Sequence, residues 1–131
     1  MAKAPVFFLC LLFSSFFTKL TLAESIENSI ANAEKIQFDL SQISSEGLIG
    51  PPNGLRSLSY EFCIPQTQAA IRDLRLIDPT IQYYRQSPGR IGCDETEYLC
   101  IGETHNPRWK EILEAIANLP YVEKIQQSFA E

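Results

Sequence analysis

The most regular part of the sequence is an alternation of apolar and polar side chains. In "LSYEFCI", residues 58–64, the apolar side chains share one face, while Ser59, Glu61 and Cys63 share the other. This period of two predicts a strand with one buried face. The following segment, residues 65–78, changes to helical spacing, with apolar side chains at Ala69, Ala70, Leu74 and Ile77.

The remainder of the chain repeats this order of elements. The predicted strand, helix, strand, strand, helix and strand lie at residues 58–64, 65–78, 80–86, 98–104, 105–119 and 121–129. In the third strand, Leu99 and Ile101 are expected to face inward. Two copies of a split strand-helix-strand unit predict an α+β fold over residues 57–131. The predicted arrangement is a ferredoxin-like βαββαβ sandwich, with an antiparallel four-stranded sheet and two helices on one face.

The first 23 residues have the three parts of a secretory signal peptide. Lys3 provides a short basic start, an apolar run follows, and Thr21 and Ala23 are small residues placed for cleavage. The apolar run has about 13 residues, whereas a membrane-spanning helix needs about 20. We predict export to a periplasmic, lumenal or extracellular location, with cleavage after Ala23 and no membrane attachment afterwards. The alternatives are an uncleaved N-terminal anchor and a lipoprotein modified at Cys10.

Residues 24–56 are predicted to form an N-terminal segment outside the main domain. Residues 24–45 carry apolar side chains at loosely helical spacing, and an isolated helix of this length is marginal in water. We expect it to fray or to dock loosely, with a role in association as the alternative. The stretch "SSEGLIGPPNGLRS" that follows has three glycines, two prolines and an Asn-Gly pair, which predicts a linker.

The charge of the mature chain argues against nucleic acid as a partner. The whole chain has 11 basic and 16 acidic residues, a net charge of −5. Removing residues 1–23 takes away Lys3, Lys19 and no acid, so nine basic residues face sixteen acids and the net charge becomes −7. Phosphate backbones and anionic lipid surfaces are bound by clustered lysine and arginine. An unknown protein or a small ligand is the expected partner.

Three cysteines, Cys63, Cys93 and Cys100, remain after the predicted cleavage. In small exported proteins paired cysteines usually form disulfides, and an odd count leaves one thiol. Alternation places Cys63 on the face opposite to that of Phe62, and Cys100 on the face opposite to that of Leu99. Both sulfurs are therefore expected on the side of the sheet without helices. We predict a Cys63–Cys100 disulfide. Cys63–Cys93 is the first alternative, and a Cys93–Cys100 hairpin clasp is the second.

Other chemistries fit these residues less well. The chain has no C-x-x-C pair and one histidine, His105, so a tetrahedral metal site lacks ligands. The oxygen-ligand spacing and central glycine of a calcium loop are missing around Asp94, Glu95 and Glu97. The sequence contains no G-x-S-x-G hydrolase turn. We predict no bound metal and no cofactor. Thiol redox chemistry at Cys93 or Cys63 is the alternative, although the acids beside Cys93 oppose formation of a thiolate.

Three further residues are candidate ligand contacts. In "GRIGC", residues 89–93, the glycines favour the positive backbone angles of a tight hairpin, with Ile91 filling the edge of the core. The alternative is an anion-binding nest with Arg90 as its charge. Tyr84 and Tyr98, together with Cys63, would form a ligand-binding patch on the helix-free face of the sheet.

The phrases "LSYEFCIP", "GRIGC", "LCIGETHNPRW" and "LPYVEKI" together resemble a group of small exported cyanobacterial proteins of unassigned function. The resemblance covers residues 57–127. It implies a periplasmic, lumenal or extracellular location and brings no active site to carry over.

These observations favour a small, exported, disulfide-stapled binding or interaction module without an evident catalytic site. A thiol oxidoreductase or redox sensor is the second hypothesis, and a small-ligand binder on the helix-free face is the third. The oligomeric state is left open by the sequence.

Overall fold

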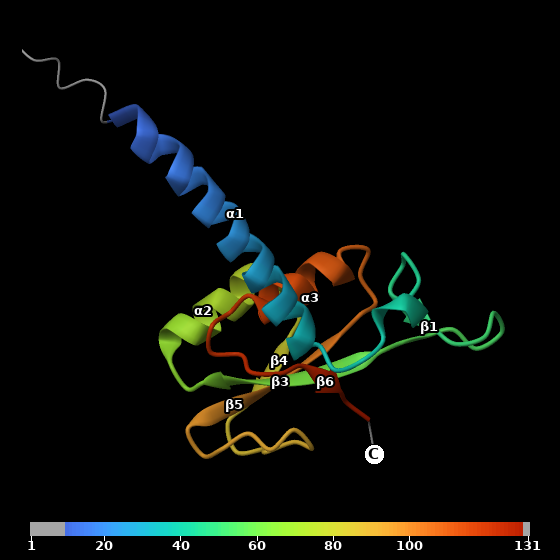
Figure 1. Ribbon diagram of the computed structural model, residues 1–131. Helices are drawn as coiled ribbons and strands as arrows, with labels where there is room; N and C mark the ends of the chain where they lie inside the picture. The colour runs from blue at the N-terminus through green and yellow to red at the C-terminus, as the bar shows by residue number, and fades with distance from the viewer. Residues whose placement is uncertain (1–9, 130–131) are drawn as a thin grey trace, which may run out of the picture. The chain divides into compact units, whose positions relative to one another are not determined.

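The computed structural model of the chain describes residues 10–129, with side chains described from Leu22 onward. The chain forms two compact units, Met1–Ala31 and Asn32–Glu131. The second unit holds the strands and two of the helices, which are shown in Figure 1.

Helix α1 (Cys10–Lys35) runs without a break through the predicted cleavage site at Ala23. Exposed apolar side chains on it recur every four residues, at Leu22, Ile26 and Ile30. Within residues 10–129, no helix is both long and apolar enough to cross a membrane. The predicted signal peptide begins in residues 1–9, which lie outside the described residues, and its cleavage stays a prediction.

Four strands form one antiparallel sheet in the second unit. Their order is β4 (Gln82–Tyr84), β5 (Glu97–Glu103), β3 (Ser59–Pro65) and β6 (Gln126–Gln127). The long strands β3 and β5 are neighbours at the centre, and every neighbouring pair is antiparallel. Strands β3 and β5 suit the centre of the sheet because each has seven residues and buries several side chains.

Two helices, α2 (Gln68–Ile77) and α3 (Trp109–Ala117), lie on one side of the sheet (Figure 1). Helix α2 begins after Thr67, whose side chain accepts a hydrogen bond of 3.1 Å from the amide of Ala70. Helix α3 begins at Trp109, four residues after the start of the helix predicted at residues 105–119. In the turn that precedes it, the side chain of Asn106 accepts a 2.8 Å hydrogen bond from the amide of Arg108.

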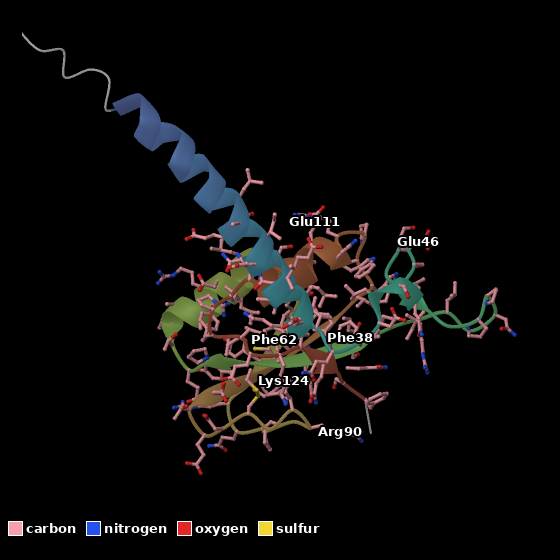
Figure 2. The ribbon with its side chains drawn as sticks, in the orientation of Figure 1. Phe38, Glu46, Phe62, Arg90, Glu111 and Lys124 are labelled. Atoms are coloured by element: carbon pink, nitrogen blue, oxygen red, sulfur yellow. A yellow bond between two sulfur atoms is a disulfide. The ribbon has the colours of Figure 1, made fainter. Side chains whose placement is uncertain are left out.

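The main core lies between the sheet and these helices. It contains the apolar row of β3 together with buried residues of both helices: Tyr60, Phe62, Ile64, Ala70, Leu74, Leu113 and Ile116. Figure 2 shows Phe62 in this interior. The prediction of mixed α and β structure with an antiparallel sheet is confirmed. The more specific ferredoxin-like βαββαβ sandwich stays a prediction.

The predicted orientation of β5 is wrong. Phe62 pairs with Cys100 and Cys63 pairs with Leu99, and residues paired across neighbouring strands share a face. Cys100 therefore belongs to the main core, while Leu99 points to the side without helices. There it packs with Ile91 and Cys93, and Ile101 and Cys63 border the cluster. Both rows of β5 contain fully or partly buried apolar side chains, so alternation alone did not reveal which row meets the helices.

The end of α1 and the residues after it belong to the second unit. The ammonium of Lys35 donates hydrogen bonds of 2.7 and 3.2 Å to the carbonyls of Ala117 and Leu119, at the end of α3. Ile36 then forms a parallel bridge with Ile125, beside β6. The expected fraying does not describe this part of the chain, because Lys35 binds the end of α3 and Ile36 pairs with Ile125 beside β6.

The glycine- and proline-rich stretch predicted as a linker is also packed. The indole of Trp109 donates a 3.0 Å hydrogen bond to the carbonyl of Ser44, and the hydroxyl of Thr104 donates a 2.7 Å bond to that of Gly47. A 3₁₀ turn, η2 (Leu40–Gln42), comes before it. The stretch contributes the two-stranded antiparallel sheet formed by β1 (Leu48–Ile49) and β2 (Arg56–Ser57).

Candidate functional site

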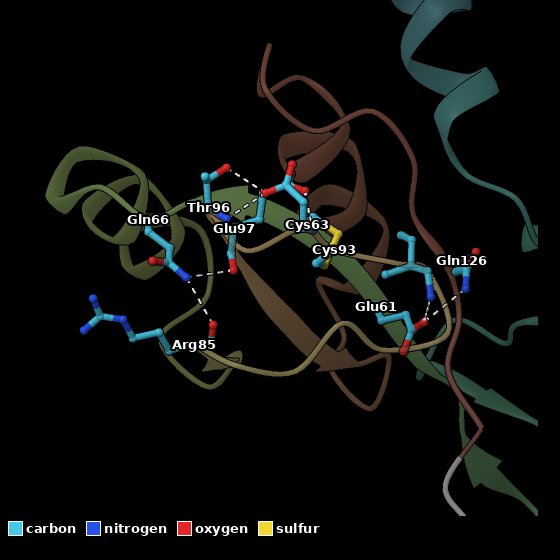
Figure 3. The surroundings of a disulfide bond; sticks show 10 residues. Glu61, Cys63, Gln66, Arg85, Cys93, Thr96, Glu97 and Gln126 are labelled. Atoms are coloured by element: carbon cyan, nitrogen blue, oxygen red, sulfur yellow. Dashed lines mark hydrogen bonds between the residues drawn. A yellow bond between two sulfur atoms is a disulfide. The ribbon is translucent and has the colours of Figure 1, made fainter.

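The helix-free side of the sheet is covered by the loop between β4 and β5, residues 85–96. A disulfide joins Cys63 on β3 to Cys93 in this loop, with 5.6 Å between their Cα atoms (Figure 3). The predicted Cys63–Cys100 disulfide is wrong, because the two residues lie on opposite faces of the sheet. The first alternative is the pairing that forms. Disulfides persist in oxidising compartments, so this bond indicates a non-reducing environment.

A second attachment of the loop is the carboxylate of Glu61, two residues before Cys63 on the same face of β3. Its Oε1 accepts a 2.7 Å hydrogen bond from the amide of Ile91 and a 3.0 Å bond from the side-chain amide of Gln126 (Figure 3). Glu61 is buried, with 3% of its surface exposed. The face of β3 that meets the loop thus provides both a sulfur and a hydrogen-bond acceptor.

This arrangement changes the interpretation of "GRIGC". Gly89 and Gly92 have positive φ angles of 62° and 82°, as a tight loop requires. The amides of Gly92 and Cys93 both donate to the carbonyl of Pro88, at 3.0 and 2.8 Å. With the Ile91 amide bound to Glu61, the amides of the predicted nest are engaged inside the protein. Ile91 packs in the apolar cluster with Cys93 and Leu99, as the hairpin interpretation predicts.

Gln66 holds the two ends of the loop together. Its side-chain amide donates hydrogen bonds of 3.1 and 3.0 Å to the carbonyls of Arg85 and Glu97, as Figure 3 shows. Close to Glu97, a tight turn is stabilised by Asp94, whose carboxylate accepts from the hydroxyl and the amide of Thr96 at 2.6 and 2.8 Å. The hydrogen bond from the Thr96 side chain, followed by that from its amide, holds the pKa of Asp94 below its usual value.

The third sulfur, Cys100, is a free thiol inside the main core with none of its surface exposed. Burial disfavours the charged thiolate and raises the pKa of Cys100 from 9.0 to about 12. Reactive cysteines depend on the opposite effect, a thiolate stabilised by nearby positive charge. Cys100 is therefore a packing residue.

We expect Cys100 in the native protein to react with iodoacetamide more than about a hundredfold more slowly than in urea at pH 8.5, because both burial and the raised pKa suppress the thiolate. Raising the pH from 7 to 10 should leave the native rate low, since this range stays below the folded-state pKa. Quenched alkylation followed by peptide mass mapping measures the rate at Cys100 itself. A native rate close to that of a model thiol would contradict the assignment.

A pocket of about 520 Å³ is formed mainly by residues at the two ends of the loop. It is an open depression with mixed polar and charged walls, lined by Gln66, Arg85, Gln86, Ser87, Pro88, Cys93, Asp94 and Glu95. Among the described residues, no cluster of histidine, cysteine, aspartate or glutamate is arranged to hold a metal ion.

The predicted ligand contacts do not come together in one place. Tyr84 pairs with Leu99 and lies on the side of the loop, whereas Tyr98 pairs with Ile64 on the helix side. Arg90 lies on the side away from the helices (Figure 2), with its guanidinium carbon 5.7 Å from the centre of the Phe129 ring. A patch of Tyr84, Tyr98 and Cys63 on a single open face is therefore not formed. Whether each residue contacts a ligand stays a prediction.

Replacing Glu61 with alanine is expected to destabilise the protein by about 1 to 3 kcal/mol, because the buried amide of Ile91 loses its acceptor. Glu61→Gln is the matched control, since its carbonyl oxygen can still accept that hydrogen bond. Urea unfolding gives the stability, and hydrogen exchange at Ile91 reports on the loop. Equal stability of the two variants would show that the hydrogen bond is unimportant.

Sequence reasoning missed Glu61 and Gln66 as the residues that hold the loop. A signal for Glu61 was present, because it shares a strand face with Cys63, and polar residues on a covered face need partners. Gln66 gave no such signal, since its two acceptors are backbone carbonyls about twenty and thirty residues further along the chain.

The fold and the site together define a small mixed α and β domain whose second sheet face is closed by a disulfide-fastened loop. No protein-family model, curated protein or solved structure matches the chain.

Proposed function

We propose that this protein is a small exported interaction module that binds a partner through its surface and has no catalytic site of its own. The observation that carries the proposal is the use made of the sulfurs. Cys63 and Cys93 fasten the loop, and Cys100 is enclosed in the core. The disulfide and the buried thiol thus have structural roles. The exposed side chains of the domain are then the groups available to bind a partner.

The second part of the proposal is that the chain is exported. The signal peptide of residues 1–23, with cleavage after Ala23, would deliver the chain to a periplasmic, lumenal or extracellular site. The disulfide supports an oxidising destination. The resemblance to small exported cyanobacterial proteins points in the same direction. Mass measurement of the exported chain tests the cleavage, because a chain that keeps residues 1–23 would remove the basis for a cleaved signal.

For the domain, we propose the ferredoxin-like arrangement. Its support is the repeated order of strand, helix and strand, first in β3, α2 and β4 and then in β5, α3 and β6. The antiparallel central pair of β3 and β5 is further support. The two-stranded sheet of β1 and β2 is an addition to that arrangement.

Thiol exchange is the second candidate, because Cys93 lines the open pocket beside the loop. In that case the Cys63–Cys93 disulfide would be the reactive group, and Arg85 would be the cationic side chain on the pocket wall. The side chain of Cys93 is nevertheless buried, with 7% of its surface exposed. A partner thiol would have to displace part of the loop before reaching the sulfur.

Photo-crosslinking of the exported chain in its own cells tests the leading proposal. A photoreactive amino acid is placed separately at three exposed apolar positions on different surfaces, Leu55, Leu76 and Phe129. We expect at least one position to give a saturable crosslink to a defined protein that unlabelled chain competes away. No competed crosslink from any position would overturn the proposal. Turnover of a peptide disulfide above that of the Cys63→Ala/Cys93→Ala variant would favour thiol exchange instead.

A further inference from the structure

The two edges of the four-stranded sheet are treated differently by the chain. Beside β6, the chain at the end of α1 pairs with Ile125. The amide of Gln37 donates a 2.8 Å hydrogen bond to the carbonyl of Ile125, and the amide of Ile125 donates a 2.8 Å hydrogen bond to the carbonyl of Lys35. At the other end, β4 has β5 as its single neighbour among the described strands, and all three of its residues are exposed. An open strand edge presents backbone donors and acceptors to a further strand.

The exposed face of α2 lies beside this open edge. The guanidinium of Arg75 donates a 3.3 Å hydrogen bond to the hydroxyl of Tyr83 on β4, which brings the helix and the strand together. Arg72 and Leu76 share this helix face by their spacing, and Leu76 is 80% exposed. We name the α2–β4 surface by its five residues: Arg72, Arg75, Leu76, Tyr83 and Arg85.

This surface is positive on a chain that is otherwise acidic. Residues 66–85 contain three arginines and two aspartates. Neither aspartate is one of the five residues of the surface. Asp73 accepts a 2.8 Å hydrogen bond from Tyr121, and Asp78 is buried and accepts from the amide and the hydroxyl of Thr80. Arg72 and Arg85 form no ion pair with another residue in the described part of the chain. Figure 3 shows the Arg85 side chain directed away from the loop.

We propose that the α2–β4 surface binds an extended acidic segment of a partner protein, which adds to the sheet along β4. Backbone hydrogen bonds would hold the segment as a strand, and its carboxylates would meet the arginines. Leu76 and Tyr83 would supply apolar contact. This inference rests on the proposed interaction role and names the partner's chemistry and its place on the domain.

The charges favour such a segment over the other occupants of a strand edge. A second copy paired through β4 would bring like-charged arginines together, which disfavours that dimer. Anionic lipid would pair with the arginines, but it would not form a strand that pairs with the backbone amides and carbonyls of β4. A peptide strand uses both features of the surface.

The test uses the ¹⁵N-labelled exported chain and a synthetic twelve-residue peptide in which glutamate alternates with valine and threonine. We expect the amide shifts to concentrate at residues 72–85. The Arg75→Glu/Arg85→Glu variant should bind the peptide about tenfold more weakly. Arg108→Glu is the matched control, because Arg108 is an exposed arginine on another element, next to the start of α3, and it should bind as the unmodified chain does.

Two further probes separate the roles of charge and backbone. A peptide with lysine in place of glutamate should not bind. A peptide with every second amide N-methylated should bind at least about tenfold more weakly, because it loses the backbone donors that would pair with β4. Equal binding of the lysine peptide, shifts outside residues 72–85, or no shifts at millimolar peptide would each overturn the inference. Arginine-dependent binding to phosphatidylglycerol vesicles without peptide binding would overturn it as well.

The outcomes distinguish this inference from the proposed function. A competed crosslink from Leu55 or Phe129, together with failure of the acidic peptide, would keep the interaction role and discard the α2–β4 surface. Absence of any competed crosslink would remove both.

Discussion

Replacing Cys63 and Cys93 together with alanine is expected to lower the free energy of unfolding by about 2 to 5 kcal/mol, the usual contribution of a native disulfide in a small domain. The bond joins residues that are 30 positions apart, so its removal returns freedom to a long stretch of the unfolded chain. In the folded state, the loop would keep Glu61 and Gln66 as attachments. Urea unfolding measures the loss against a total stability of about 5 to 15 kcal/mol.

Reduction of the unmodified protein is the matched control for this prediction. Reductant should destabilise the unmodified chain by a similar amount and should leave the double variant unchanged. Hydrogen exchange should accelerate most at residues 85–96, while amides of the central strand pair β3 and β5 keep the greater protection. A loss below about 1 kcal/mol would show that hydrogen bonds and packing, rather than the disulfide, hold the loop.

Gly47→Ala is expected to destabilise the protein by roughly 2 to 5 kcal/mol, the combined effect of a left-handed backbone and of overpacking. Gly47 is buried, with a φ angle of 85°, and a Cβ atom there would overlap the carbonyl of Thr104. The clash falls on backbone that cannot yield easily. Thr104 has no exposed surface, and its hydroxyl both donates to Gly47 and accepts from the amide of Leu58 at 3.0 Å.

Gly92 offers a control with nearly the same backbone angle. Its φ is 82°, and an added Cβ would meet no atom within 4 Å. Gly92→Ala should therefore show only the cost of the left-handed conformation, about 1 to 2 kcal/mol. Urea unfolding of both variants measures the difference. Equal losses would mean that the stretch around Gly47 moves aside and is the linker that its composition suggests.

Local patterns were sufficient to predict the order of the elements from β3 to β6. The alternation in β3 identified its buried row correctly, because Tyr60, Phe62 and Ile64 all belong to the main core. Asp78 ends α2 directly before Pro79, where the proline restricts the backbone. Such features depend on residues that are close in sequence, so the sequence alone determines them.

Alternation failed at β5 for a reason that the structure makes clear. Cys100 and Leu99 point to opposite faces, and yet both are buried, with 0% and 3% of their surfaces exposed. One face is covered by the helices and the other by the loop. A strand covered on both sides contains no polar row to mark the outside. The wrong face for Cys100 led directly to the wrong disulfide.

Composition also misjudged the stretch from Ser44 to Ser57. Its glycines and prolines do allow turns, as expected, but they do not determine whether the turns are free. Trp109 and Thr104, about sixty residues further along the chain, donate hydrogen bonds to its carbonyls. Contacts at that separation have no local signature, so a packed loop and a free linker have the same composition.

The sequence by itself determined the succession of strands and helices from β3 to β6, the acidic net charge and the presence of three cysteines after residue 23. These properties depend on composition and on spacing within each element. Only the tertiary structure decided that Cys63 pairs with Cys93, that Glu61 holds the loop, and that one edge of the sheet is covered while β4 is left open. Each of these depends on which distant segments pack together, and such contacts have no local pattern in the sequence.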